Sequence, residues 1–201
     1  MTIPKQPNGQ RYDYLSLCVA SNDQLEMAMR QGVRPRLEDL AGWEFRGYNT
    51  LVLTEMLGFR KFKKGFYQAD PSEQDPSYLN GYNVQVVQTP LADPWFDRVK
   101  GGLSIKHAWY RCYPVRMTEV DCRYPNAVLV NYDCPEAKSY DPSTRLRDYV
   151  VQLYQDNKDL FLGKAYVALA GPIRVFVSYF VLERENPSSL QIPSEGHPSS
   201  E

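Results

Sequence analysis

Residues 145–184 read "RLRDYVVQLYQDNKDLFLGKAYVALAGPIRVFVSYFVLER". Three runs rich in valine, leucine, tyrosine and phenylalanine are separated by two short groups of turn-forming residues, 155–159 and 170–172. Strands joined by connections this short pair with their neighbours in antiparallel fashion. This stretch therefore predicts a three-stranded antiparallel meander.

The same alternation of strand-like runs and turn signals extends upstream. Further candidate strands are 43–57, 58–68, 78–88, 106–113 and 126–133. Together with the meander they make about eight strands in consecutive hairpins. Closing such a sheet removes its exposed edges, so we expect a mainly β protein, an antiparallel up-and-down β-barrel.

A short helical segment precedes the strands. Ser21 and Gln24 have the spacing of a capping box, Leu25 and Met29 give an apolar stripe, and Gly32 supplies a C-terminal cap. We therefore expect an N-terminal arm with a short helix over 1–36 and the barrel over 37–184. Residues 185–201 are rich in proline and serine and predict a disordered tail.

Composition excludes several classes of protein. Hydrophobic residues make up 43% and charged residues 23%, which is ordinary globular usage, and the net charge of −1 favours no nucleic-acid partner. No apolar run is long enough to span a membrane, and the N-terminus lacks the apolar region of a secretory signal, so we expect a cytoplasmic protein. The four cysteines lack zinc-site spacing, and we expect no metal. The oligomeric state stays open.

One basic stretch, "GFRKFKKGFY" at 58–67, stands out from this balance. Strand alternation puts Phe62 and Lys64 on one face and Lys61 and Lys63 on the other, which divides the charge between two faces. We interpret it as a solvated strand whose lysines discourage edge pairing. The alternative is a grip on single-stranded nucleic acid through charge and stacking.

The strand "KHAWYRCY" at 106–113 carries the clearest candidate binding surface. Its odd-numbered face combines aromatic and polar side chains: His107, Trp109, Arg111 and Tyr113. Ligand cavities commonly combine aromatic walls with a few polar groups. Because Leu103 and Ile105 continue this face with apolar residues, we expect it to point into the barrel.

The order of these features resembles the lipocalin and fatty-acid-binding superfamily, the calycins. Lipocalins enter their barrel through a short helix into a Gly-x-Trp motif, and a late arginine packs across the tryptophan. Here Gly42 and Trp43 are adjacent and follow "RLEDLA", while Arg184 or Arg174 could supply the arginine. The resemblance covers roughly 37–184 and implies a barrel that can hold one small ligand, with Trp43 nearby.

A second similarity concerns two Arg-x-Tyr pairs. Intracellular fatty-acid-binding proteins use such a pair on a late strand to hold a ligand carboxylate, and this chain has Arg111 with Tyr113 and Arg147 with Tyr149. Residues two apart on a strand share a face, so a guanidinium and a phenol can converge on one anionic group. Neither pair lies at the end of the chain, unlike the family pattern.

We therefore expect the barrel to bind a small hydrophobic or amphipathic molecule with a polar or anionic end. The expected ligand contacts are Trp43, His107, Trp109, Arg111, Tyr113, Arg147 and Tyr149. Two long connections, 89–102 and 132–145, are candidate lids for the barrel mouth.

Two alternatives share the barrel and centre on His107. In the first, the protein is an enzyme of isomerase, cyclase or lyase type, with His107 as the base. The acids that could orient it are Asp121, Glu119, Asp133 and Asp148. In the second, His107 is an axial ligand to haem. Outside that case the sequence predicts no cofactor, and it carries no recognised catalytic motif.

Overall fold

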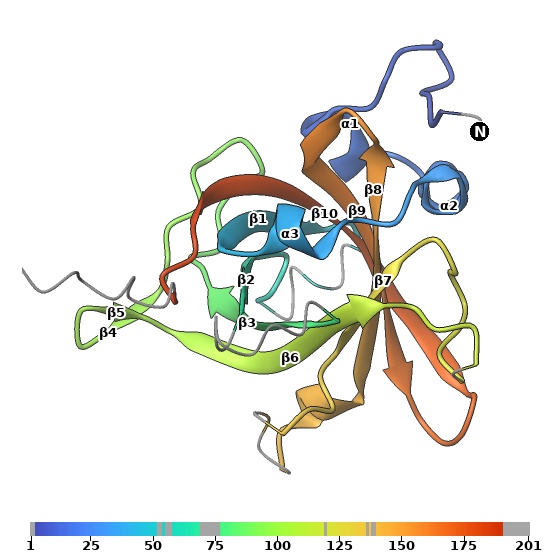
Figure 1. Ribbon diagram of the computed structural model, residues 1–201. Helices are drawn as coiled ribbons and strands as arrows, with labels where there is room; N and C mark the ends of the chain where they lie inside the picture. Colours follow the sequence, from blue (N-terminus) through green and yellow to red (C-terminus); the bar gives the residue numbers. More distant parts are fainter. Residues whose placement is uncertain are drawn as a thin grey trace, which may run out of the picture.

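A computed structural model describes residues 3–51, 54, 58–68, 77–118, 120–135, 137 and 140–190. Within these residues, eight strands close into an antiparallel barrel in the order β1-β10-β9-β8-β7-β6-β3-β2 (Figure 1). They are β1 (Trp43–Asn49), β2 (Lys61–Tyr67), β3 (Leu79–Gln85), β6 (Lys106–Pro114), β7 (Val128–Asn131), β8 (Leu146–Tyr154), β9 (Asn157–Ala168) and β10 (Arg174–Pro187). The predicted mainly β, up-and-down barrel is confirmed.

The C-terminal meander forms the longest part of the wall. Strand β9 pairs with β8 on one side and β10 on the other, and β10 then pairs with β1 to close the barrel. Trp43 lies opposite Pro187, so β10 continues three residues past the predicted boundary at 184. Residues 191–201 of the predicted tail lie outside the described residues.

Two segments differ from the sequence-based expectation. Strand β1 ends at Asn49, well before the predicted limit at residue 57. In the segment 89–102, predicted as a loop, β4 (Val99–Lys100) begins a small hairpin that β5 (Leu103–Ser104) completes, separate from the barrel sheet. Gly101 and Gly102 form its turn with positive φ angles of 61° and 80°, which glycine adopts without steric cost.

Three short helices precede the barrel: α1 (Tyr14–Cys18), α2 (Asn22–Gln31) and α3 (Leu37–Leu40). The predicted capping box of α2 is present, because the Ser21 side chain accepts from the Gln24 backbone amide and Gln24 accepts from the Ser21 amide. Helix α1 was not expected, although Asp13 and Ser16 form a second capping box. No helix in the described part of the chain is long and apolar enough to span a membrane.

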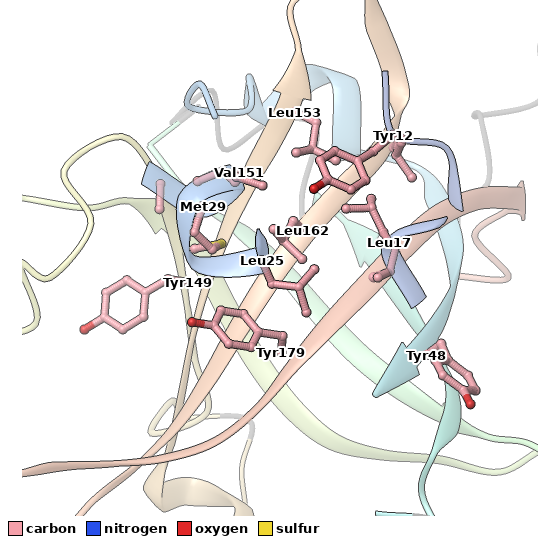
Figure 2. Close-up of a cluster of buried hydrophobic side chains, with 14 of the residues drawn as sticks. Tyr12, Leu17, Leu25, Met29, Tyr48, Tyr149, Val151, Leu153, Leu162 and Tyr179 are labelled. Atoms are coloured by element: carbon pink, nitrogen blue, oxygen red, sulfur yellow. The ribbon is translucent and has the colours of Figure 1, made fainter. Parts of the chain in front are cut away.

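The apolar residues form two separate cores, one on each side of the barrel wall. The outer core lies between the wall and helices α1 and α2, where Leu25 and Met29 of α2 lie beside Val151 and Leu162 (Figure 2). Burial of this helix face is what holds the N-terminal segment to the barrel.

The inner core fills only one half of the barrel. Edge-to-face ring contacts join Phe45 to Phe66 at 5.7 Å and to Phe161 at 5.3 Å, and Phe66 to Tyr110 at 5.6 Å between ring centroids. Leu40 of α3 belongs to the same core. Aromatic rings thus close the end of the barrel at which β1 begins.

Trp43 and Arg184 complete this closed end. The Arg184 guanidinium carbon lies 4.4 Å from the centroid of the Trp43 ring, and its Nη2 donates to the carbonyls of Asp39 and Lys158, both at 2.8 Å. Of the two arginines predicted for this role, Arg184 is the correct one. Arg174 instead pairs with Asp121 at 2.6 Å.

Candidate functional site

The open half of the barrel holds a cavity of about 710 Å³. Its apolar wall comes from the inward faces of β2, β8, β9 and β10: Phe62, Leu146, Ala165, Val167, Val177 and Phe180. Asn49 and Phe59 line the mouth from the β1–β2 side, and Asp141 and Ser143 line it from the connection before β8. A cavity of this size accommodates a small organic molecule.

Four polar side chains meet inside the barrel and line this cavity; we refer to Lys64, Asn83, Tyr132 and Asp148 as the interior polar cluster. Lys64 Nζ donates to Asn83 Oδ1 at 3.1 Å and to the Tyr132 hydroxyl, and lies 3.2 Å from Asp148 Oδ2. Tyr132 in turn donates to Asp148 Oδ2 at 3.0 Å. Each polar group therefore has a partner, as burial requires.

Strand alternation explains why these charges are inside. Lys64 lies between Phe62 and Phe66 on the inward face of β2, and Asp148 lies between Leu146 and Val150 on that of β8. The interpretation of 58–67 as a solvated edge strand is therefore wrong. β2 pairs on both sides, and Lys61, Lys63 and Lys64 are all buried.

Burial shifts the ionisation of the cluster towards neutral forms. It lowers the pKa of Lys64 despite the opposing attraction of Asp148, and it raises the pKa of Asp148 despite the opposing attraction of Lys64. Burial also raises the pKa of Tyr132, which stays a phenol. Inside the barrel, the neutral amine and carboxylic acid are closer in energy to the ion pair than they are in water.

His107 reaches the cavity because of a bulge in β6. Asn83 lies opposite His107 and Gly81 lies opposite Tyr110, so β6 has one extra residue between these pairs. Ala108 takes up the extra residue with a φ angle of 48°, unusual for a residue with a side chain. His107 is exposed at the cavity mouth, where partial desolvation and Lys64 lower its pKa against the opposing effect of Asp141, which favours the neutral imidazole.

Beyond the bulge the odd-numbered face of β6 points outward, so the prediction that this whole face lines the cavity is wrong. Trp109 packs against Tyr82 with ring centroids 5.7 Å apart, and the Arg111 guanidinium lies 4.8 Å from the Tyr78 ring. The Tyr113 hydroxyl accepts from Asn131 Nδ2 at 3.1 Å. The inward residues are Ala108, Tyr110 and Cys112.

Arg147 and Tyr149 do converge on one anion, as their spacing predicted, but on the outer wall. The anion is the carboxylate of Asp121, 3.6 Å from Arg147 Nε and 3.4 Å from the Tyr149 hydroxyl. Tyr149 belongs to the outer core (Figure 2). This Arg-x-Tyr pair therefore holds the protein's own Asp121.

Both candidate lids border the cavity, but segment 89–102 also packs on the outer wall through Trp95. Trp95 of segment 89–102 is buried against the outer wall, where its Nε1 donates to the carbonyl of Gly47 at 3.1 Å and the Lys61 ammonium lies 3.8 Å from its ring centroid. Segment 89–102 still borders the cavity through Arg98, and segment 132–145 borders it through Tyr132 and residues 141–143.

Sequence reasoning missed Lys64, Asn83 and Tyr132 as site residues and considered Asp148 only as a partner of His107. The available signal was a charge at the centre of an apolar strand face, in "FKKGF" for Lys64 and in "LRDYV" for Asp148. Asp121 and Asp133 lie on the outer wall with Arg147, and Glu119 lies outside the described residues.

Within the described ranges, no three histidine, cysteine, aspartate or glutamate side chains gather as they would around a metal ion. Comparison with protein-family models and with curated proteins finds no match to this chain. The function must therefore be inferred from the cavity itself.

Proposed function

We propose that this protein binds a small, mostly apolar molecule in the open half of its barrel, in the manner of a calycin. The observation that supports this most strongly is the cavity of about 710 Å³, with an apolar wall and a polar cluster at its inner end. An apolar pocket with a few placed polar groups is the usual form of a small-molecule site.

The closed end supports the calycin resemblance. Trp43, with Arg184 stacked across it at 4.4 Å, lies next to a short helix that covers the end of the barrel, which is the arrangement that the resemblance implied. Membership of that superfamily is part of the proposal, as is the predicted cytoplasmic location.

The polar end of the ligand is best satisfied as a neutral group, such as a hydroxyl, carbonyl or amide. Lys64 and Asp148 sum to zero charge, and the mouth carries both Arg98 and Asp141. A carboxylate near Asp148 would meet a like charge as well as the Lys64 ammonium, and burying it would cost desolvation energy. The sequence led us to expect a ligand with a polar or anionic end, and the cavity favours a neutral polar end.

Native mass spectrometry of freshly purified protein, with organic extraction, tests the proposal. We expect one small apolar molecule per chain that carries a neutral polar group and leaves on denaturation. Protein that is empty, and that also fails to take up the neutral fluorophore N-phenyl-1-naphthylamine, would contradict the proposal.

One observation favours a second candidate, an enzyme with His107 as the base. His107 lines the same cavity as Asp148 and has a lowered pKa, so its neutral imidazole could accept a proton from a bound molecule. His107→Ala should then abolish conversion of the extracted molecule while its binding persists. Recovery of that molecule unchanged after incubation with the wild-type protein would argue against this candidate.

Haem ligation by His107 remains an alternative of the same kind. Titration with haem should produce a Soret band that His107→Ala removes. A band that is identical in the variant would exclude His107 as the axial ligand.

A further inference from the structure

We infer that Lys64 forms a Schiff base with an aldehyde or ketone held in the barrel cavity. This inference rests on the proposed function and names the chemical class of the ligand: an apolar molecule that carries a carbonyl group. It follows from the position of one amine and from the route by which that amine can lose a proton.

Two lysines among the described residues border the cavity, Lys61 and Lys64. The Lys61 ammonium is engaged on the outer wall, where it donates to Thr89 Oγ1 at 2.9 Å and to the carbonyls of Pro90 and Asp93 at 2.7 and 2.8 Å. The Lys64 amine lies inside the barrel, beside Tyr132 and Asp148. It is therefore the amine that a bound carbonyl would meet.

An amine attacks a carbonyl only in its neutral form, and the interior polar cluster provides a way to reach it. Tyr132 accepts a hydrogen bond from Lys64 Nζ and donates its own proton to Asp148 at 3.0 Å. A proton can therefore pass from the ammonium to Asp148, either through the phenol or directly across the 3.2 Å between Nζ and Oδ2. Burial disfavours both charges, which supports this transfer.

The reaction needs no further reactant. Lys64 Nζ forms a bond to the carbonyl carbon, and the carbonyl oxygen takes the proton held by Asp148, giving a carbinolamine. The carbon–oxygen bond then breaks, and the oxygen leaves as water with a second proton that comes from Nζ. The products are one protonated imine, whose charge is balanced by the Asp148 carboxylate, and one water molecule, and addition of water reverses the reaction.

The apolar wall complements this chemistry. Phe62, Val177 and Phe180 line the same cavity as the cluster and suit the apolar body of such a ligand. The Lys64 ammonium also lies 5.6 Å from the Phe180 ring centroid, so the reactive group and the apolar wall belong to one site.

Reductive trapping on the full-length protein tests the inference. The protein is incubated at neutral pH with 2-naphthaldehyde and sodium cyanoborohydride, and the adduct is located by intact mass and fragment mapping. We expect one adduct per chain, with Lys64 modified at least tenfold faster than Lys63. Lys63 is a matched internal control, because it is the adjacent residue, also buried, but it points outward and pairs with Asp97 and Glu185, both at 2.9 Å.

Modification spread evenly over exposed lysines, with Lys64 no faster than Lys63, would overturn the inference. The alcohol 2-naphthalenemethanol separates this result from failure of the proposed function, because it has the same rings and no carbonyl. If the alcohol binds but the aldehyde leaves no adduct on Lys64, only the Schiff base is refuted. If neither compound binds, both proposals fail.

A Lys64→Arg variant keeps the cation beside Asp148 and should lose the fast adduct completely. An adduct that persists in this variant at the wild-type rate would place the reactive amine elsewhere. The fragment map of the wild-type protein decides the question even if the variant does not fold.

Discussion

Lys64 of β2 and Asp148 of β8 form an ion pair inside the barrel, with Nζ and Oδ2 3.2 Å apart and both residues at most 3% exposed. Their strands are not neighbours in the sheet, so the pair crosses the interior. A buried ion pair commonly stabilises a fold no better than well-packed apolar residues of similar volume. The pair is thus better explained by the cavity that it lines than by a need for stability.

The ion pair makes a prediction about stability. Lys64→Met leaves Asp148 buried without its cation, and we expect the free energy of unfolding at pH 7 to fall by about 3 kcal/mol. The double variant Lys64→Met/Asp148→Leu should recover most of this loss, because it removes both charges. Urea denaturation measures both values, and a single variant as stable as the wild type would show that the pair contributes nothing.

Lowering the pH should reduce the loss of stability that Lys64→Met causes. Without Lys64, the pKa of Asp148 rises further than burial already raises it, so the carboxyl group becomes neutral as the pH falls. The stability difference between Lys64→Met and the wild type should therefore shrink between pH 7 and pH 5. A difference that is constant over this range would mean that Asp148 does not carry the charge.

We expect acid to weaken the attachment of helix α2 to the barrel, because that attachment involves the Glu26 carboxylate. Burial would raise the pKa of Glu26, but hydrogen bonds from Lys164, Tyr179 and Tyr124 outweigh it and lower the pKa to about 2. A lowered carboxyl pKa gives stability that is complete above the ordinary value of 4.5 and is lost as the pH falls towards 2.

We expect Glu26 to contribute on the order of 2–3 kcal/mol of such pH-dependent stability. Glu26→Gln should lack this pH-dependent contribution. The free energies of unfolding of the variant and the wild type, plotted against pH, should therefore approach each other below pH 3. Guanidinium denaturation at a series of pH values measures the two curves. Parallel curves would contradict the role given to Glu26.

The outer position of the Arg-x-Tyr residues predicts that they do not affect the ligand. Arg111→Ala and Tyr113→Phe should leave the affinity for N-phenyl-1-naphthylamine within twofold of the wild type, because both side chains lie outside the barrel. Fluorescence titration measures this. A tenfold loss of affinity in either variant would mean that this face of β6 contacts the ligand.

Arg184 and Trp43, which stack at the closed end of the barrel, should contribute to the stability of the fold but not to ligand affinity. Arg184→Ala removes the contact with Trp43 and the hydrogen bonds to two carbonyls, and we expect it to cost on the order of 1–2 kcal/mol. Ligand affinity should not change, because the cavity lies in the other half of the barrel. Thermal unfolding and titration on the same sample test both statements.

The sequence predicted the barrel well because strand runs and turn signals are local. The spacing of residues predicted the meander of β8, β9 and β10 and the capping box at Ser21. The arginine over Trp43 was instead implied by the resemblance to lipocalins, which left Arg184 and Arg174 as candidates. The site was harder to predict, because each of its residues depends on which face of a strand points inward.

One bulge accounts for most of the error. Ala108 takes up an extra residue in β6, so His107 faces the cavity while Trp109, Arg111 and Tyr113 face outward. No local pattern in "KHAWYRCY" marks that bulge. Lys64 was misplaced for a different reason, because a lysine between two phenylalanines was interpreted as solvent-facing although its partner, Asp148, lies 84 residues along the chain.

The most direct test of the central claim compares two valine-to-phenylalanine variants. Val177 lines the cavity, whereas Val99 lies on the β4–β5 hairpin and is 63% exposed. Titration with N-phenyl-1-naphthylamine should show at least a tenfold loss of affinity in Val177→Phe and wild-type affinity in Val99→Phe, with both variants folded by circular dichroism. Equal affinity in the two variants would mean that the ligand does not occupy the barrel cavity.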